Sequence, residues 1–235
     1  MAESLEAETK TEKQTDEWVE FNIFEPVSGV SKNYPFFPKE VLPNLELFKI
    51  GAAISISQSD YYVPLLYDGL RLRIQTPVLY VPFPIQTYRN KGSSIEKYSL
   101  QLSLQSHTPD TKEFKTFVQS IDTVAMSLVP LPPESYFSPI RYSYTNPQLP
   151  PIMRIKIPAD KETLLVDCYA DGISISEPKV QTLRDLLSTH CSVKCILELS
   201  NIWVVPEKFG VSWKLVQISV YEHQTSGPLF RPPET

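Results

Sequence analysis

Basic and aromatic side chains alternate in two stretches of this chain, residues 71–98 and 202–220. The cations are Arg71, Arg73, Arg89, Lys91, Lys97 and Lys214, and the rings among them are Tyr80, Phe83, Tyr88, Tyr98, Trp203, Phe209 and Trp213. Cations bind a phosphate backbone, and aromatic rings stack on unpaired bases. The two stretches therefore predict a groove for single-stranded nucleic acid, with the alternative that most of these rings belong to the hydrophobic core.

Alternating apolar residues predict the strands that would hold these side chains on one surface. They occupy every second position at 48–56, 70–74, 98–104 and 153–157. In the second segment the polar residues between them are Arg71 and Arg73, and in the fourth they are Arg154 and Lys156. Residues two apart on a strand point to one face. A solvated face explains either pair alone, and the two pairs together favour a functional stripe.

Some of the aromatic rings are expected in the core. Trp213 and Tyr98 alternate with aliphatic residues on their strands, which is typical of a buried face. Trp203 lies at the edge of a Pro-containing turn and fits either the core or the binding surface. The better candidates for contact lie in a polar loop, and they are Tyr88, Arg89 and Lys91.

Two segments show helical spacing instead. Residues 110–128 carry apolar side chains three or four positions apart, with Asp110 and Glu113 as a capping box and a Pro-rich stop after residue 128. A second, shorter helix is predicted from after Ser176 to about residue 190. Strands around two isolated helices, without a regular βαβ repeat, predict a mainly β (α+β) domain such as a partly open barrel.

The negative charge of the chain is concentrated at its N-terminus. Residues 1–20 hold seven carboxylates and two lysines, so they carry −5, the whole net charge of the chain. The predicted organisation is an acidic disordered tail at 1–18, a Pro- and aromatic-rich arm with an extra strand at 19–66, a binding domain at 67–224 and a flexible tail at 225–235. The acidic tail either keeps the protein in solution or shields the groove.

Length and composition indicate one sizeable domain, or a domain with extensions. A chain of 235 residues with 42% hydrophobic content is long enough to bury a core. The sequence has no apolar run of 18 residues and no signal-peptide pattern, so we expect an intracellular protein without a membrane partner.

Sequence motifs for catalysis and for cofactor binding are missing. There is no Gly-rich phosphate loop, no Gly-flanked serine and no His pair at metal-ligand spacing. Cys191 and Cys195 lie beside His190, but zinc sites normally need a second ligand pair, so we expect buried thiols. The sequence therefore predicts a protein that is not an enzyme and holds no metal or cofactor.

Three blocks of the sequence resemble one protein family. They are TPVLYVPFPIQTYRNKGSSIEKYSLQLSL at 76–104, YFSPIRYSYTNPQLPPIMRIKIP at 136–158 and VKCILELSNIWVVPEKFGVSWKLVQISV at 193–220. Together they resemble the single-stranded DNA-binding proteins of large nucleocytoplasmic DNA viruses, an OB-fold family related to phage replication-fork proteins. The third block is the most specific, because Trp203 and Trp213 flank a Gly turn ten residues apart.

This resemblance implies an OB-fold-like, partly open five-stranded barrel with an N-terminal extension. It implies a protein that coats unpaired DNA without base specificity during viral replication, recombination or repair, in the host cytoplasm at a viral factory or in the nucleus. Single-stranded DNA is the implied partner, while RNA, replication proteins and a homo-oligomer stay open. The candidate nucleic-acid-binding residues are Arg71, Arg73, Tyr80, Tyr88, Arg89, Lys91, Arg141, Tyr142, Arg154, Lys156, Trp203, Lys208 and Lys214.

Two other classes of protein remain as alternatives. A viral structural or assembly protein, in which the β domain and the Pro-rich arm bind protein, would explain the acidic balance. A metal-dependent nuclease would need Asp160, Asp167 or Asp171 to converge with a glutamate and a lysine. Salt-sensitive binding to single strands distinguishes the leading interpretation from the first alternative.

Overall fold

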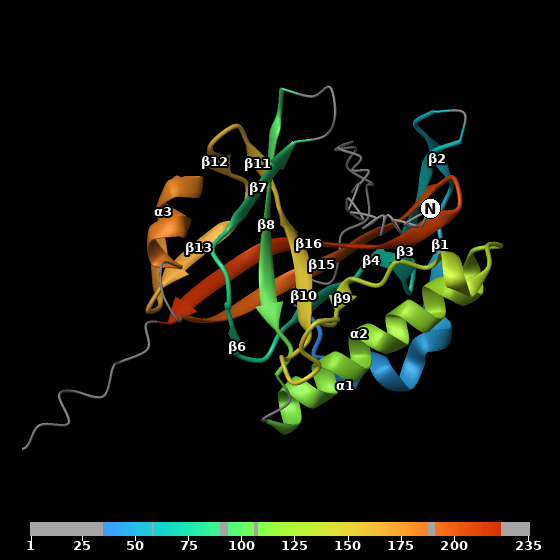
Figure 1. The fold of residues 1–235 in the computed structure, drawn as a ribbon, viewed down its shortest axis with the longest axis horizontal. Coiled ribbons are helices and arrows are strands. Elements are labelled where there is room, and N and C mark those ends of the chain that lie inside the picture. The colour runs from blue at the N-terminus through green and yellow to red at the C-terminus, as the bar shows by residue number, and fades with distance from the viewer. Residues whose placement is uncertain (1–34, 58, 90–93, 106–107, 188–190, 222–235) are drawn as a thin grey trace, which may run out of the picture.

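The structure, a computed structural model, describes residues 35–57, 59–89, 94–105, 108–187 and 191–221. It contains one large sheet, a separate two-stranded ribbon and, within the described residues, three α-helices (Figure 1). This confirms the predicted mainly β class. The predicted acidic tail and C-terminal tail lie outside the described residues.

A long hairpin forms the centre of the sheet. Its strands, β15 (Ser192–Val205) and β16 (Lys208–Tyr221), pair antiparallel from end to end. In the first half of β15 the apolar residues Val193, Cys195 and Leu197 are buried, while the residues between them face the other side. The hairpin therefore has a core face and a second face, called the polar face below, which carries Lys214.

Other strands join the two edges of this hairpin. On one edge β15 pairs with β3 (Tyr61–Tyr67), β5 (Arg73–Gln75) and β6 (Leu79–Tyr80). On the other edge β16 pairs with β10 (Ile152–Ile157) and β13 (Asp167–Ala170). β10 then pairs with β8 (Glu96–Ser103), and β8 with β7 (Gln86–Arg89). In Figure 1, β8 and β10 cross the long hairpin steeply.

Shorter strands extend the sheet. They are β1 (Phe48–Ile50), β2 (Ile54–Ser55) and β4 (Leu70–Arg71) on β3, β9 (Ile140–Arg141) on β10, and β14 (Ile173–Ile175) on β13. The separate ribbon pairs β11 (Ala159–Asp160) with β12 (Thr163–Leu164). The strand order runs from β1 to β7, and the pairing among described residues does not join these two ends. A closed barrel is therefore not confirmed.

Two of the predicted strands are interrupted. Residues 48–56 form β1 and β2 with a gap between them, and residues 70–74 form β4 and β5, separated at Leu72. The second interruption has a clear cause, because β4 pairs with β3 whereas β5 pairs with β15. The chain changes partner at Leu72, whose carbonyl accepts a hydrogen bond from the Leu199 amide at 2.9 Å.

The long predicted helix is confirmed as α2 (Pro109–Leu128), but its cap differs from the prediction. Thr108 is the N-cap, and its hydroxyl accepts a hydrogen bond from the Thr111 amide at 3.2 Å. Pro109 follows at the first helical position, where a missing N–H costs nothing. The capping box predicted at Asp110 and Glu113 was therefore wrong, because the N-cap lies two residues earlier.

The remaining helices are short. α3 (Val180–Leu186) confirms the second predicted helix, although it ends earlier than expected. α1 (Pro38–Val41) and the 3-10 turns η1 (Leu42–Leu47) and η2 (Pro133–Ser135) were not predicted. Val41 and Phe48 belong to the common hydrophobic core, and the predicted boundary between arm and domain, at residues 66 and 67, falls inside β3.

α2 covers part of the core face of the hairpin. The Phe117 ring meets the Trp213 ring edge-on, with centres 6.1 Å apart. Trp213 is 1% exposed and Tyr98 4%, which confirms that both rings belong to the core. All three cysteines are buried, free thiols, as predicted. The opposite face of the sheet is thus the one that can present Lys214 and its neighbours.

Candidate nucleic-acid interface

Six residues from six neighbouring strands lie in register on the polar face. Successive Cα partners are Arg73 on β5, Glu198 on β15, Lys214 on β16, Lys156 on β10, Ser99 on β8 and Gln86 on β7. We call these residues the polar row. Neighbouring strands are about 4.8 Å apart, so the row places side chains from distant parts of the sequence side by side. It includes one member of each of the two predicted basic pairs.

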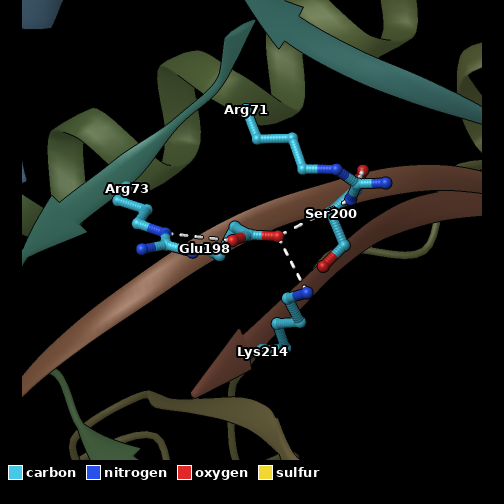
Figure 2. Close-up of polar contacts among 5 residues, drawn as sticks. All are labelled: Arg71, Arg73, Glu198, Ser200 and Lys214. Atoms are coloured by element: carbon cyan, nitrogen blue, oxygen red, sulfur yellow. Dashed lines mark hydrogen bonds and ion pairs between the residues drawn. The ribbon is translucent and has the colours of Figure 1, made fainter. Parts of the chain in front are cut away.

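Glu198 lies between three cations (Figure 2). Arg73 and Lys214 belong to the row, and Arg71 lies beside it. Its Oε2 accepts a hydrogen bond from Arg73 Nε at 3.1 Å, while its Oε1 lies 2.8 Å from Lys214 Nζ and 3.6 Å from Arg71 Nη1. Arg71 also donates to the carbonyl of Ser200 at 3.4 Å. Glu198 and the three cations, the Glu198 cluster, together carry a charge of +2.

The carboxylate of this cluster is buried, whereas its cations are not. Burial raises the pKa of Glu198, but the hydrogen bond and charge of Lys214, followed by those of Arg73, outweigh this and hold the pKa below its usual value. The side chain of Glu198 is 4% exposed, compared with 44% for Arg73 and 28% for Lys214. The cations therefore keep a solvent-facing side on which a phosphate oxygen can bind.

An Arg–Tyr stack lies beside the other end of the row. The guanidinium of Arg154 lies 4.8 Å from the centre of the Tyr88 ring, and its Nε donates to Ser99 Oγ at 3.0 Å. Lys156 Nζ donates to Ser212 Oγ at 3.1 Å. The two hydroxyls hold these cations on the polar face. This end of the row therefore offers both positive charge and an aromatic ring.

A second aromatic group lies near the tip of the hairpin. Trp203 and Gly210 are cross-strand partners, and a Cβ at Gly210 would lie 2.8 Å from Cζ2 of Trp203, so the indole covers the glycine. Phe137 meets Trp203 edge-on with ring centres 6.1 Å apart, and the Arg141 guanidinium lies 3.5 Å from the centre of the Phe137 ring. We call Trp203, Phe137 and Arg141 the aromatic ladder. Trp203 itself is half-buried.

Asp122 of α2 anchors the segment that carries Phe137. Its Oδ1 accepts a hydrogen bond from Tyr136 Oη at 2.6 Å, and its Oδ2 accepts one from Ser138 Oγ at 2.7 Å. Burial raises the pKa of Asp122 to about 6, although both hydrogen bonds act to lower it. Because Tyr136 and Ser138 flank Phe137, this buried carboxylate fixes the position of the aromatic ladder relative to α2.

Two predicted site residues have other partners. Arg89 on β7 forms an ion pair with Glu96 of β8, and the hydrogen bond from Arg89 is the main cause of a lowered Glu96 pKa. Tyr142 lies beside α2, where its hydroxyl accepts a hydrogen bond from Gln119 at 3.4 Å and its ring lies 5.5 Å from Lys115 Nζ. The structure therefore places Tyr142 on the helix-covered side, away from the polar row.

Two further predicted residues, Tyr80 and Lys208, lie away from the row. Tyr80 on β6 is the Cα partner of Ser192, six positions along β15 from Glu198. Lys208 is exposed at the start of β16, where it extends the polar face towards the hairpin tip. Lys91 lies outside the described residues.

Sequence reasoning missed Glu198, the acid of the row, and Phe137, one ring of the ladder. The signal for Glu198 was present, since it lies between the buried residues Leu197 and Leu199 and so belongs to the opposite face of its strand. No local pattern identifies its partners, because Arg73 and Lys214 come from other strands. Phe137 carries no periodic signal, as it precedes Pro139 in an irregular segment.

No protein-family model matches this sequence, and no curated protein is significantly similar to it. None of the helices in the described part of the chain is long and apolar enough to cross a membrane. The described residues also contain no group of three or more His, Cys, Asp and Glu side chains that could hold a metal ion. The acids of the nuclease alternative, Asp160, Asp167 and Asp171, are thus not part of such a group.

Proposed function

We propose that this chain binds single-stranded DNA along the polar row, without base specificity. The observation that carries the proposal is the register of Arg73, Lys214 and Lys156 on three different strands, which concentrates positive charge on one face of the sheet. Such cations bind phosphates and release counterions whatever the base sequence. The chain as a whole is acidic, so the charge of this face is local.

Aromatic rings at two places on the polar face support the same proposal. Tyr88, stacked with Arg154, lies at the β7 end of the row, and Trp203 with Phe137 lies further along the hairpin, towards its tip. Stacking on an aromatic ring contributes about 1–3 kcal/mol per base and accepts any base. Cations and aromatic rings on one face are the combination that binds a single strand, since its unpaired bases are open to stacking.

We also propose that the sheet is an open relative of the five-stranded OB barrel. β6, β15, β16, β10 and β8 pair in succession, and β6 lies against β8, so the series returns towards its start. Leu79, Leu100 and Leu215 are buried in the core, and the polar row belongs to the opposite face of the strands. OB folds bind oligonucleotides on an outer strand face of this kind.

The biological role of the proposal rests on the resemblance to viral single-stranded DNA-binding proteins. That resemblance covers roughly residues 70–222, which include every member of the polar row. It supports a protein that coats unpaired DNA during replication, recombination or repair, at a viral factory or in the nucleus. The proposed role involves no catalysis and no cofactor.

The proposal is tested by fluorescence anisotropy of labelled oligo-dT, a matched RNA and a matched duplex, each titrated with the full chain at two salt concentrations. We expect tight binding of oligo-dT that weakens with salt, and much weaker binding of the duplex. Absence of binding to all three at low salt would reject the proposal. Equal affinity for oligo-dT and duplex would reject the role assigned to the aromatic rings.

A protein-binding role is the second candidate, and one surface favours it. The loop between β9 and β10 exposes Tyr144 at 97% and Leu149 at 54%, and exposed apolar side chains in one loop are typical of protein contacts. If oligonucleotides do not bind, this loop becomes the first site to examine for an assembly partner.

A further inference from the structure

The acid within the polar row needs an explanation of its own. Glu198 is 3% exposed and has Arg73 and Lys214 as register partners on its two sides. A buried carboxylate loses its hydration and must be compensated by partners, and replacing a buried ion pair with apolar residues is often neutral or stabilising. Stability alone therefore does not require an acid at this position.

The geometry of the Glu198 cluster has two electrostatic consequences. Figure 2 shows Arg73, Arg71 and Lys214 converging on the carboxylate from different directions, so one acid fixes three cations that would otherwise repel one another. The same acid also repels any phosphate that approaches these cations. The first effect orders the binding surface, and the second lowers its affinity.

We infer that Glu198 is a positioning residue that sets the phosphate affinity of this surface: it holds Arg71, Arg73 and Lys214 together while reducing their combined charge from +3 to +2. The inference rests on the proposed function and adds that Glu198 limits the affinity of the surface for DNA. A surface with one net positive charge fewer releases DNA more readily, and its affinity for DNA depends less steeply on salt concentration.

The direct test is Glu198→Gln, which removes the charge but keeps the size and a hydrogen-bond acceptor. At 0.1 M salt, oligo-dT should bind up to about fivefold more tightly, and the slope of log affinity against log salt should steepen by up to about 0.7. The melting temperature should fall, because three cations lose their shared anion. A purely structural Glu198 predicts a lower melting temperature with weaker or unchanged binding, so the two roles differ in sign.

Glu113→Gln is the matched control, since it makes the same change in net charge on α2, which packs on the core face of the sheet. Binding by Glu198→Gln that is no tighter than binding by Glu113→Gln would overturn the inference. Tighter binding of oligo-dT by Glu198→Gln alone would support it.

A second variant covers the case in which Glu198→Gln does not fold. The double substitution Glu198→Gln/Lys214→Gln removes one charge of each sign, so the cluster keeps its charge of +2 and leaves no buried carboxylate. Its salt slope should equal that of the wild type, whereas Lys214→Gln alone should be shallower. A double variant as shallow as Lys214→Gln would contradict the charge-setting role.

Failure of the proposed function gives a different result from failure of this inference. If the wild-type protein does not bind oligo-dT, the proposed function fails, and the charge-setting role is then read from elution on phosphocellulose. Elution of Glu198→Gln at higher salt than Glu113→Gln would support the role of Glu198 as a counter-charge, and equal elution would overturn it.

Discussion

Lys156 on β10 and Lys214 on β16 are Cα partners at the point where these two strands pair. Like charges on directly opposed residues are destabilising. Each lysine has a partner that eases this repulsion, since Lys214 lies 2.8 Å from the Glu198 carboxylate and Lys156 donates to Ser212. A phosphate bound between the two lysines would relieve the repulsion further. We therefore assign this pair to the centre of the proposed DNA-binding surface.

Tyr88→Leu separates stacking from charge. Loss of one stacked base should weaken oligo-dT binding by about 1–3 kcal/mol, or roughly 5- to 150-fold, while the salt slope stays unchanged because no cation is removed. Anisotropy titrations at several salt concentrations measure both quantities. Tyr142→Leu, beside α2, is the control and should bind normally. Equal losses in the two variants would show that Tyr88 has no special role.

Gly210→Ala should destabilise the hairpin tip. A Cβ at this position would lie 2.5 Å from the Phe137 carbonyl oxygen and 2.8 Å from the Trp203 ring, so the aromatic ladder must move. Overpacking of this kind costs about 1–3 kcal/mol of unfolding free energy. Gly51→Ala is the control, because the atoms nearest to its Cβ would be those of the Pro64 side chain, at 3.4 Å, an ordinary contact. Urea denaturation of both variants measures the difference, and equal stabilities would contradict the packing described for Trp203.

Asp122 predicts a pH dependence of stability with a definite sign. Its folded pKa, about 6, lies above the ordinary 3.8, so the folded state holds the proton more tightly. The stabilisation from this group is therefore complete below about pH 4 and is lost as the pH rises through 6, by at most about 3 kcal/mol. Relative to Asp122→Asn, the wild type should be more stable at pH 4 than at pH 7. Melting temperatures across this range test the sign, and a constant difference would contradict it.

The acidic N-terminal segment predicts an effect on affinity. Residues 1–20 carry the whole net charge of −5, and negative charge tethered to the chain competes with DNA for the cations of the polar row. A chain that begins after residue 20 should bind oligo-dT more tightly at low salt, with a smaller gain at high salt because of screening. Unchanged affinity at low salt would leave the segment a role in solubility alone.

Local patterns in the sequence predict much of this fold, and long-range register explains the rest. The spacing of Phe114, Phe117 and Ile121 predicts α2 because helix contacts are local. In the same way, period-two alternation predicts that Arg154 and Lys156 share a face.

Whether Arg154 and Lys156 lie on the same surface as the other basic pair, Arg71 and Arg73, depends on how β15 and β16 align. Register shifts between Ile196 and Leu197 and between Leu199 and Asn201 set this alignment. Single-strand periodicity contains no information about such bulges. Sequence reasoning therefore found the cations of the row but could not show that Arg73 and Lys214 meet at Glu198.

The most direct test of the account is the salt dependence of oligo-dT binding by Arg154→Gln/Lys156→Gln. These two cations lie on the polar face but outside the Glu198 cluster, so their loss leaves no buried acid unpaired. Lys112→Gln/Lys115→Gln on α2 is the control with the same change in net charge. We predict that the slope of log affinity against log salt becomes shallower by up to about 1.4 for the first variant and stays unchanged for the second. Equal slopes for the two variants would contradict the assignment of the polar row as the DNA-binding surface.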